Sequence, residues 1–530
     1  MFKNKKILII IILAVVLFFV YACPYFELRP QTDTGEMWIF NTPDEMANYF
    51  FIANFNNNSE LKVSEPLNNL VGSLNIVHPR SMQVASGNLV PGNFLGFILI
   101  LGWLAKIFGL ASVPFIIPFF SLLAIICFYL ILKSFFEEKI AFWSALLLMI
   151  LPAFWYYSSR SLFNNVLFLD FLIIGFYLLV RFSNKKNVVN LVVAGLLIGS
   201  ALTMRTADLA WVGLLLILFC WFRRREIGWP YWLLLIVLIF VPFLPILFYQ
   251  LQLYGGALAT GYSLKAQAVG SFWLLHTAQK FLLPFGFSLK NIFYNFYFYF
   301  IKMFWWYFWP GLLGGLTLIY QWLKGRLTLE KKRYFVLFVL VSLFILLYYG
   351  SWFFFNNLMG KALIGSSQTR YLLPIYILSL PLAVYGFDKV LQFIKIIYLK
   401  KIIFLLIAVI MIFFSVRVVW TSGEESLGSV IKTVKSYQQI NKEVRRLTEN
   451  NAIIVSSYND KVFFPQRKVI YYWQEPQFLA SISLFMKEAP VYLYSINGPA
   501  DENYIKSNSQ LKLELVKKIN ASETLYKLTN

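Results

Sequence analysis

The sequence predicts an all-α polytopic membrane protein that ends in a small α/β domain. Apolar stretches of about 20 residues, the length that a helix needs to cross a bilayer, recur between Ile7 and Trp420. The short segments between these stretches carry clusters of lysine and arginine, which is typical of cytoplasmic loops. From Thr421 onward the composition is that of a soluble chain.

The composition excludes several classes of protein. Hydrophobic residues make up 59% of the chain, and the formal net charge is +22. Because the positive residues follow the loops, we interpret the charge as membrane topology and expect no nucleic-acid partner. Cys23, Cys127 and Cys220 lie in or beside apolar segments, so no disulfide framework is expected. The only histidines are His78 and His276, which excludes a histidine-rich metal site.

The N-terminal segment has two interpretations. Lysines near the start precede the apolar run 7–22, as in a signal peptide or in a first membrane span. Residues 20–23 resemble a weak lipoprotein cleavage box, but Tyr21 fits that box poorly and no small-residue cleavage site stands out. We therefore expect an uncleaved first span that begins in the cytoplasm.

The orientation of all later spans depends on the apolar stretch 94–108, which is short for a crossing helix. If this stretch crosses, the basic clusters divide between the two sides of the membrane. If it lies along the outer surface as an interfacial helix, every cluster is cytoplasmic, and this alternative is favoured. We therefore expect residues 24–111 to form a first outer loop that contains interfacial helices.

This orientation predicts about eleven spans within residues 1–420. They are expected at 7–22, 114–132, 140–157, 163–180, 188–204, the run before Arg223, 231–251, 299–323, 334–349, 371–387 and 402–420. Residues 421–530 are expected to form an extracytoplasmic domain with a helix at 426–449 and strands at 451–457, 468–473 and 490–496. No internal repeat is visible, which argues against transporters built from paired halves.

Polar residues gather at the predicted outer ends of the spans. They are Asp44 and Glu45, Arg160 and Asn164, Arg205 and Asp208, and Lys361, Gln368 and Arg370. A carboxylate beside several arginines suits glycosyl transfer from a lipid phosphate. The carboxylate can accept the proton of an attacking hydroxyl, and the cations can stabilise the departing phosphate. The alternative for Asp44 and Glu45 is a helix start after Thr42 and Pro43, where first-turn acids suit the helix dipole.

Four segments resemble motifs of the GT-C-fold membrane glycosyltransferases, of the protein mannosyltransferase and aminoarabinose transferase type. They are Thr42–Glu45 with Tyr49, Ser158–Arg160 through Asp170, Gly195–Arg205, and Arg370–Pro374. The resemblance covers residues 1–420. It implies interfacial helices in the first loop, an extracytoplasmic active site, a polyprenyl-phosphate-linked sugar donor and inversion at the anomeric carbon. Many members carry a Lys/His-Pro-Pro signature where this chain has His78-Pro79-Arg80.

Together these observations predict a glycosyltransferase in the cell membrane of a prokaryote, with Asp44 or Glu45 as catalytic base. Candidates for donor phosphate and lipid binding are Arg160, Arg205, Arg370 and Lys361. Candidates for support are Asn164, Asp170, His78 and Arg80. The expected partners are the lipid-linked donor, membrane lipids and a glycan, lipid or protein acceptor. The sequence indicates no metal ligand and leaves open whether a divalent cation assists.

Several of these residues have structural alternatives. Arg205 could pair with Asp208 to close a hairpin, and Arg370 could anchor its span at the interface. Arg160 lies outside against the positive-inside bias, which favours phosphate binding. For Asp170, inside a span, we favour a structural partner on a neighbouring helix.

Three rival functions remain open. A transporter or lipid flippase would need ionisable residues near the bilayer centre and related halves. A lipid-linked-glycan polymerase or ligase would favour basic residues in one large outer loop, and Lys265, Lys280 and Lys290 fit this class. In the third case the C-terminal domain is a binding module and the membrane part is mainly scaffold.

Overall fold

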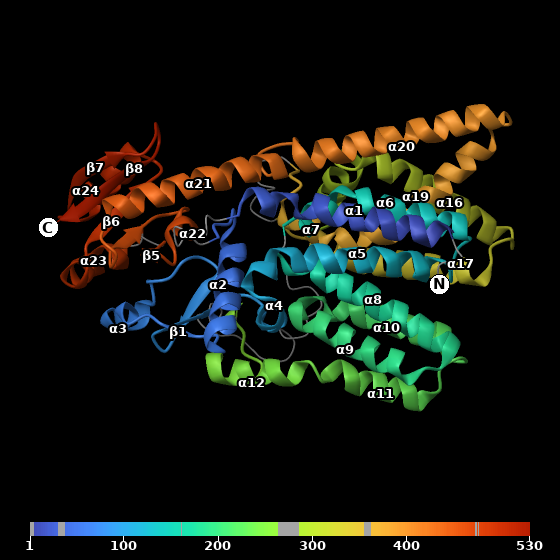
Figure 1. Ribbon diagram of the computed structural model, residues 1–530, viewed down its shortest axis with the longest axis horizontal. Coiled ribbons are helices and arrows are strands. Elements are labelled where there is room, and N and C mark those ends of the chain that lie inside the picture. Colours follow the sequence, from blue (N-terminus) through green and yellow to red (C-terminus); the bar gives the residue numbers. More distant parts are fainter. Residues whose placement is uncertain are drawn as a thin grey trace. The chain divides into compact units, whose positions relative to one another are not determined.

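A computed structural model describes residues 5–29, 38–160, 162–262, 286–353, 362–471, 474 and 476–529 (Figure 1). The chain divides into two compact units. We call Met1–Phe26, Val113–Leu244 and Gly270–Ser429 the helical unit. We call Glu27–Ser112, Pro245–Val269 and Val430–Asn530 the mixed unit. The predicted boundary between residues 420 and 421 stays a prediction. Lys265, His276, Lys280 and Lys361 lie outside the described residues.

The helical unit is a bundle in which α8 packs between α5 and α9 (Figure 1). Its main helices are α1 (Lys5–Glu27), α5 (Val113–Leu132), α6 (Glu138–Ile150), α7 (Pro152–Ser158), α8 (Asn164–Lys185), α9 (Val188–Met204), α10 (Leu209–Arg223), α11 (Trp229–Phe240), α15 (Leu289–Phe296), α16 (Trp305–Leu323), α17 (Leu329–Gly350), α18 (Ser367–Tyr371), α19 (Leu373–Gln392) and α20 (Ile397–Trp420). Small residues allow close helix packing. A Cβ at Gly314 of α16 would lie 1.9 Å from the Leu382 carbonyl oxygen of α19, so only glycine fits there.

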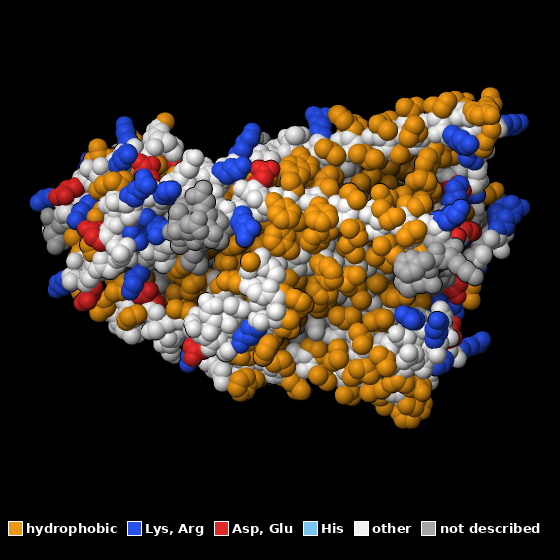
Figure 2. Space-filling view, viewed as in Figure 1, with side chains coloured by type: hydrophobic (Ala, Val, Ile, Leu, Met, Phe, Trp, Pro, Cys, Tyr) orange, Lys and Arg blue, Asp and Glu red, His pale blue; other side chains and the backbone are white. Residues whose placement is uncertain are grey.

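Among the described residues, eight helices are long and apolar enough to cross a membrane, and a bent pair makes a possible ninth. The protein is therefore an integral multi-pass membrane protein. Figure 2 shows hydrophobic side chains covering much of the visible face of these helices. The bent pair is α6 and α7, inclined by 54°, where one continuous span at 140–157 was predicted. Pro152 begins α7, and its missing N–H favours a break. Two other predicted spans form α9, which has 17 residues, and the aromatic α16, and neither is among the eight.

The mixed unit contains two sheets. The first sheet is antiparallel and has the strand order β1-β3-β2. Its strands are β1 (Val63–Ser64), β3 (Asn88–Pro91) and β2 (Met82–Ala85). The second sheet has the strand order β5-β4-β6-β8-β7. Its strands are β5 (Lys468–Ile470), β4 (Ile453–Val455), β6 (Val491–Ser495), β8 (Thr524–Thr529) and β7 (Lys512–Lys518). In it β5, β4 and β6 are parallel, whereas β8 pairs antiparallel with β6 and β7. The helices are α2 (Pro43–Asn58), α3 (Leu67–Leu70), α4 (Leu95–Phe108), α12 (Phe243–Tyr254), α21 (Leu427–Leu447), α22 (Asp460–Phe463), α23 (Pro476–Glu488) and α24 (Pro499–Asn508).

The first loop and the C-terminal segment share one hydrophobic core. Leu67 and Val77 from the first loop pack in the same cluster as Ile453, Phe485 and Leu493. The predicted C-terminal helix is confirmed by α21, and the three predicted strands by β4, β5 and β6. The pattern of the sequence did not predict β7, β8, α23 or α24.

Helix α4 coincides with the stretch that decided the predicted orientation. Its 14 residues span about 21 Å, which is less than the hydrocarbon core of about 30 Å. It packs so closely on α2 that a Cβ at Gly102 would lie 2.6 Å from the Phe55 ring. Trp103 and Phe108 are 58% and 67% exposed, as expected of a helix with one face toward lipid. The interfacial position of α4 stays a prediction.

Candidate functional site

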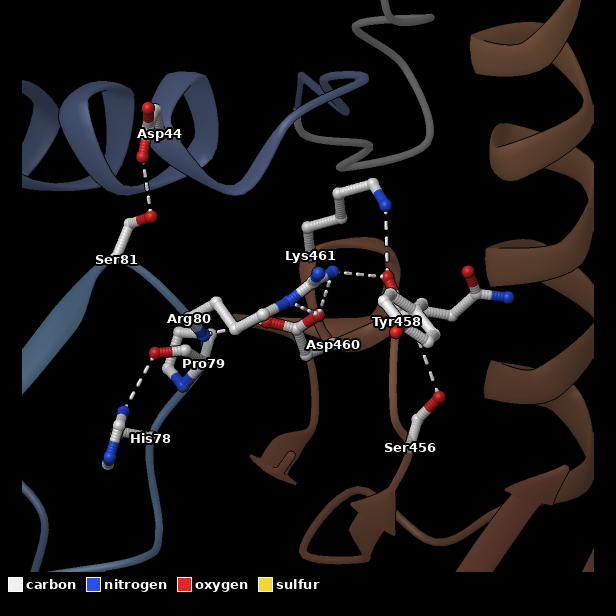
Figure 3. Close-up of polar contacts among 10 residues, drawn as sticks. Asp44, His78, Pro79, Arg80, Ser81, Ser456, Tyr458, Asp460 and Lys461 are labelled. Carbon is white, nitrogen blue, oxygen red and sulfur yellow. Dashed lines mark hydrogen bonds and ion pairs between the residues drawn. The ribbon is translucent and has the colours of Figure 1, made fainter. Parts of the chain in front are cut away.

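Asp44 lies in the first turn of α2, at a helix start that the sequence specifies locally. Thr42 is the N-cap and Pro43 the first helical residue, as predicted. The Asp44 carboxylate accepts a hydrogen bond of 2.6 Å from the Ser81 hydroxyl, which comes from the residue before β2 (Figure 3). The side chain is only half-buried. Asp44 is therefore oriented by a specific donor and is accessible to solvent.

Glu45 has a different environment from its neighbour. Its carboxylate accepts hydrogen bonds from the Thr42 backbone N–H at 3.2 Å and from the Thr42 hydroxyl at 3.0 Å. The Thr42 hydroxyl in turn accepts from the Glu45 N–H, which completes a capping box. Glu45 is 1% exposed. This geometry favours a helix-capping role for Glu45 and leaves Asp44 as the better candidate base.

Arg80 connects the first loop with the C-terminal segment (Figure 3). Its Nε and Nη2 donate to Asp460 Oδ1 at 2.9 and 2.7 Å, and its backbone N–H donates to Asp460 Oδ2 at 2.7 Å. The guanidinium also lies 5.2 Å from the Tyr458 ring centroid. His78 Nδ1 lies 2.8 Å from the Pro79 carbonyl oxygen. No local sequence pattern indicates a role for Asp460, because its partner is 380 residues away.

Lys461, next to Asp460, is a buried cation that the sequence analysis did not single out. Its ammonium donates to the Tyr458 carbonyl oxygen at 2.9 Å and lies 5.0 Å from the Tyr437 ring centroid. Burial, followed by the nearby charge of Arg80, lowers the pKa of Lys461 from 10.5 to about 8. Asp460 and Glu45 partly oppose this shift. The Lys461 ammonium therefore loses its proton more readily than that of an exposed lysine.

The helical unit gathers three of the predicted arginines around two aromatic rings. Arg160 and Arg370 lie 5.3 and 4.7 Å from the Phe163 ring centroid. Arg205 and Arg370 lie 5.0 and 5.4 Å from the centroid of Tyr371. The three guanidinium groups come from the α7–α8 connection, the end of α9 and α18. We call Arg160, Arg205 and Arg370 the arginine cluster. Such cation–π contacts help to hold the guanidinium groups in place.

Neutral hydrogen-bond partners further orient two members of this cluster. Arg160 Nη1 donates to the Tyr156 hydroxyl at 2.7 Å, and Arg160 is 4% exposed. Arg370 Nη2 donates to the Ser367 hydroxyl at 3.0 Å. Glu425, which lies beside Tyr156, was not among the residues predicted from the sequence. A Cβ at Gly365 would be 2.5 Å from Glu425 Oε2 and 2.7 Å from the Tyr156 hydroxyl.

Arg205 is held by an acid, as the structural alternative predicted. It forms an ion pair with Asp208. Its Nη2 donates to the Tyr349 hydroxyl at 3.1 Å, and that hydroxyl donates to Asp208 at 2.9 Å. Arg205 Nη1 also reaches Asn164 Oδ1 at 3.4 Å, so Asn164 does lie at the cluster. The charge of Arg205 is therefore largely balanced within the protein.

Asp170 lies inside α8 and is fully buried. One of its oxygens accepts a hydrogen bond of 2.9 Å from the Ser121 hydroxyl of α5, which confirms the predicted partner on a neighbouring helix. Within the described part of the chain, its other oxygen has no hydrogen-bond partner. In the same part of the chain, no three His, Cys, Asp or Glu side chains come close enough to hold a metal ion.

Comparison with known proteins identifies the fold. Residues 95–249 match the sequence profile of the family described as dolichyl-phosphate-mannose-protein mannosyltransferase. The structure of ArnT from Cupriavidus metallidurans superposes with a TM-score of 0.56 at 11% identity, covering 98% of this chain and 97% of that one. The chain has the GT-C fold. This confirms the resemblance drawn from the four motifs and the predicted architecture of a helical membrane part with a small α/β region.

Other GT-C proteins are similar to the chain. The oligosaccharyltransferase AglB from Archaeoglobus fulgidus, in complex with an inhibitory peptide and a dolichol-phosphate, has a TM-score of 0.58 at 13% identity. That match covers 96% of this chain and 72% of AglB. An oligosaccharyltransferase from Archaeoglobus fulgidus in the apo form has a TM-score of 0.56 at 14% identity, with the same coverage of the two chains. No curated protein matches the sequence.

Proposed function

We propose that the protein is a membrane glycosyltransferase that moves a sugar from a polyprenyl-phosphate donor to an acceptor, with inversion at the anomeric carbon. The observation that carries the proposal is the arginine cluster, in which Arg160 and Arg370 share one aromatic ring at the end of a bent helix in a GT-C fold. Anionic oxygens bind guanidinium groups strongly. The structure of AglB with a dolichol-phosphate supports a lipid-phosphate ligand for this fold.

In this proposal Asp44 is the general base. It accepts the proton of the acceptor nucleophile while that nucleophile attacks the anomeric carbon, and the bond between this carbon and the phosphate oxygen breaks. The sugar joins the acceptor in a single displacement, and the polyprenyl phosphate leaves with the bonding electron pair. The hydrogen bond from Ser81 keeps the Asp44 carboxylate in one orientation.

Arg160 and Arg370 stabilise the negative charge that develops on the departing phosphate. Arg160 donates a hydrogen bond to the Tyr156 hydroxyl and Arg370 to the Ser367 hydroxyl, and both guanidinium groups lie close to the Phe163 ring. Arg205 differs because Asp208 balances its charge, and we assign it the role of positioning Tyr371 and Asn164. Lys361 stays a predicted donor ligand. The active site and the C-terminal segment face away from the cytoplasm of a prokaryotic cell.

The function is tested with purified protein in lipid nanodiscs and a panel of polyprenyl-phosphate sugars, with glycan, lipid and peptide acceptors in separate arms. Donor-dependent product formation is the expected result. Asp44→Asn should abolish it while leaving the protein folded, whereas Glu60→Gln, at the exposed segment after α2, should keep wild-type activity. An active double variant Asp44→Asn, Glu45→Gln would refute the assigned base.

A second candidate is transfer from a lipid diphosphate, as in a glycan polymerase or ligase. The similarity to an oligosaccharyltransferase is the reason to test this second class of donor. Parallel arms with polyprenyl-diphosphate sugars distinguish the two, because each class of enzyme should release only its own lipid carrier.

A further inference from the structure

We propose that the C-terminal segment positions the candidate base through a chain of contacts that joins Asp460, Arg80, Ser81 and Asp44 (Figure 3). All four residues belong to the mixed unit. The inference rests on the proposed function, since it concerns the same carboxylate. It goes further because it gives the C-terminal segment a role in the reaction. Ser81, Arg80 and Asp460 act through Asp44, so they are positioning residues.

The chain begins at a fully buried carboxylate. Asp460 is 0% exposed, and both of its oxygens accept hydrogen bonds from Arg80. One of these donors is the backbone N–H of Arg80, so the ion pair holds the main chain as well as the side chain. Arg80 Nη2 also donates to the Tyr458 carbonyl oxygen at 2.6 Å. A buried charge with several donors has one favourable arrangement, because any other leaves the charge unsatisfied.

Ser81 follows directly and has a strained backbone. Its φ is 64°, in the left-handed region that side-chain-bearing residues rarely adopt. Three neighbours hold it there. Arg80 is fixed by Asp460 on one side, and Met82 begins β2 on the other. The third is Gly92, where a Cβ would lie only 2.6 Å from the Ser81 carbonyl oxygen.

This backbone conformation directs the Ser81 hydroxyl to the Asp44 carboxylate, 2.6 Å away (Figure 3). Loss of the Asp460–Arg80 pair would allow the backbone at Ser81 to relax to a commoner conformation. The hydroxyl would then turn away from Asp44. The orientation of the base therefore depends on a residue from the C-terminal segment.

The test compares Ser81→Ala and Asp460→Asn with a matched control. Lys468 and Glu65 form a second ion pair between the same two segments, at 2.7 Å, without a link to Ser81. We expect Ser81→Ala and Asp460→Asn each to lower kcat about tenfold with an unchanged KM for the donor, the loss expected for one orienting hydrogen bond. Glu65→Gln should keep the wild-type kcat. The double variant Ser81→Ala, Asp460→Asn should be no slower than Ser81→Ala, because both changes break one chain of contacts.

Two results would overturn the inference. One is an equal loss of kcat in Asp460→Asn and Glu65→Gln, which would mean that docking of the segments alone matters. The other is a double variant whose loss is the product of the two single losses. Failure of the proposed function is a separate result, since it would appear as the absence of donor-dependent product from the wild-type protein.

A different observation carries a second inference, which is independent of the transfer reaction. We infer that the helical unit binds an anionic phospholipid in a groove among α1, α6, α19 and α20. The cavity has a volume of about 620 Å³ and is lined mainly by apolar side chains, among them Trp143, Phe404 and Met411. Its volume is in the range of sites that hold small ligands.

The charged residues of this groove lie at one end. Lys139 is in the first turn of α6, Asp388 near the end of α19, and Lys400 and Lys401 near the start of α20. Lys139 pairs with Asp388, so the positive charges of Lys400 and Lys401 remain for a ligand. An apolar groove with cations at one end fits the acyl chains and phosphate of a phospholipid. The arginine cluster is elsewhere, at the opposite ends of α6–α7 and α19.

The probe is phosphatidylglycerol, with phosphatidylcholine as the neutral competitor in mixed nanodiscs. Mass spectrometry of protein released from the discs measures the lipid that stays bound. We expect Lys400→Gln, Lys401→Gln to lose at least about fivefold of the retained phosphatidylglycerol, on the basis of two lost ionic contacts. The control Lys389→Gln, Lys395→Gln removes two nearby lysines that do not line the groove and should lose none. Equal losses in the two variants, or retention of a polyprenyl phosphate in place of phosphatidylglycerol, would overturn the inference.

Discussion

The two groups of candidate residues are held in opposite ways. In the mixed unit, hydrogen bonds and a buried ion pair orient Asp44, through Ser81 and Arg80. In the helical unit, aromatic rings and hydroxyl groups contact Arg160 and Arg370. A general base needs one orientation of its carboxylate, whereas cation–π contacts can hold a guanidinium group where an anionic ligand binds. The difference between these environments teaches which polar residues serve chemistry and which serve the fold.

The most direct test of this comparison replaces each of the two neighbouring acids, Asp44 and Glu45, by its amide. Asp44→Asn should lower kcat by about 10³-fold, within the range of general-base catalysis. Glu45→Gln should stay within about threefold of wild type, because glutamine still serves in a capping box. Product formation from a lipid-linked donor measures both. Similar losses in the two variants would mean that the helix start as a whole, and not Asp44, is what the reaction needs.

The next largest effect separates Arg205 from the other arginines. Asp208→Asn leaves the Arg205 charge uncompensated in a buried position and should destabilise the folded protein by about 3 kcal/mol. Thermal unfolding in detergent measures this loss. Glu330→Gln, which removes a partly exposed partner of Arg333, is the control and should cost less than about 1 kcal/mol. An equally stable Asp208→Asn protein would show that Arg205 finds its counter-charge elsewhere.

Arg160 and Arg370 should affect donor binding instead of folding. Arg160→Gln and Arg370→Gln should each raise the KM for the lipid-phosphate donor by about tenfold, as expected for one charged hydrogen bond. Initial rates over a range of donor concentrations measure the change. Arg326→Gln, in an exposed loop, should leave KM unchanged. A fall in kcat at constant KM would argue against donor binding in the ground state.

The smallest expected effect is a pH dependence in the mixed unit. The pKa of Lys461 is about 8 in the folded protein and 10.5 in an unfolded chain, so between these values the unfolded state binds more protons. The stability of the mixed unit should therefore rise as the pH increases from 8 to 10.5, and Lys461→Met should remove that rise. Hydrogen exchange in β4 and β5 at several pH values measures the local stability. If the local stability still rises with pH in Lys461→Met, the rise belongs to another titratable group.

Local patterns allowed much of this fold to be predicted. Hydropathy located the spans, and Thr42, Pro43 and Glu45 marked the start of α2, because caps and spans depend on residues close together in the chain. The break between α6 and α7 was missed, since apolar residues continue through Pro152 and only tertiary packing decides whether a helix bends there.

The candidate site was predictable only in part. The arginines could be grouped because a membrane orders the ends of helices, and the structure brings Arg160, Arg205 and Arg370 together. The contact between Arg80 and Asp460 has no local signal, because it joins a loop to a segment 380 residues later. Single-sequence patterns do not report such pairings.

The core that Leu67 and Val77 share with Ile453 has a consequence for biosynthesis. Ribosomes add about 5–20 residues per second, so roughly 20–80 s pass between synthesis of Arg80 and of its partner Asp460, 380 residues later. During that interval the early loop has left the ribosome without the partners that complete its interior. A nascent chain that stops before residue 460 would therefore be inserted in the membrane with an unfinished loop, which makes it a natural target for quality-control proteases.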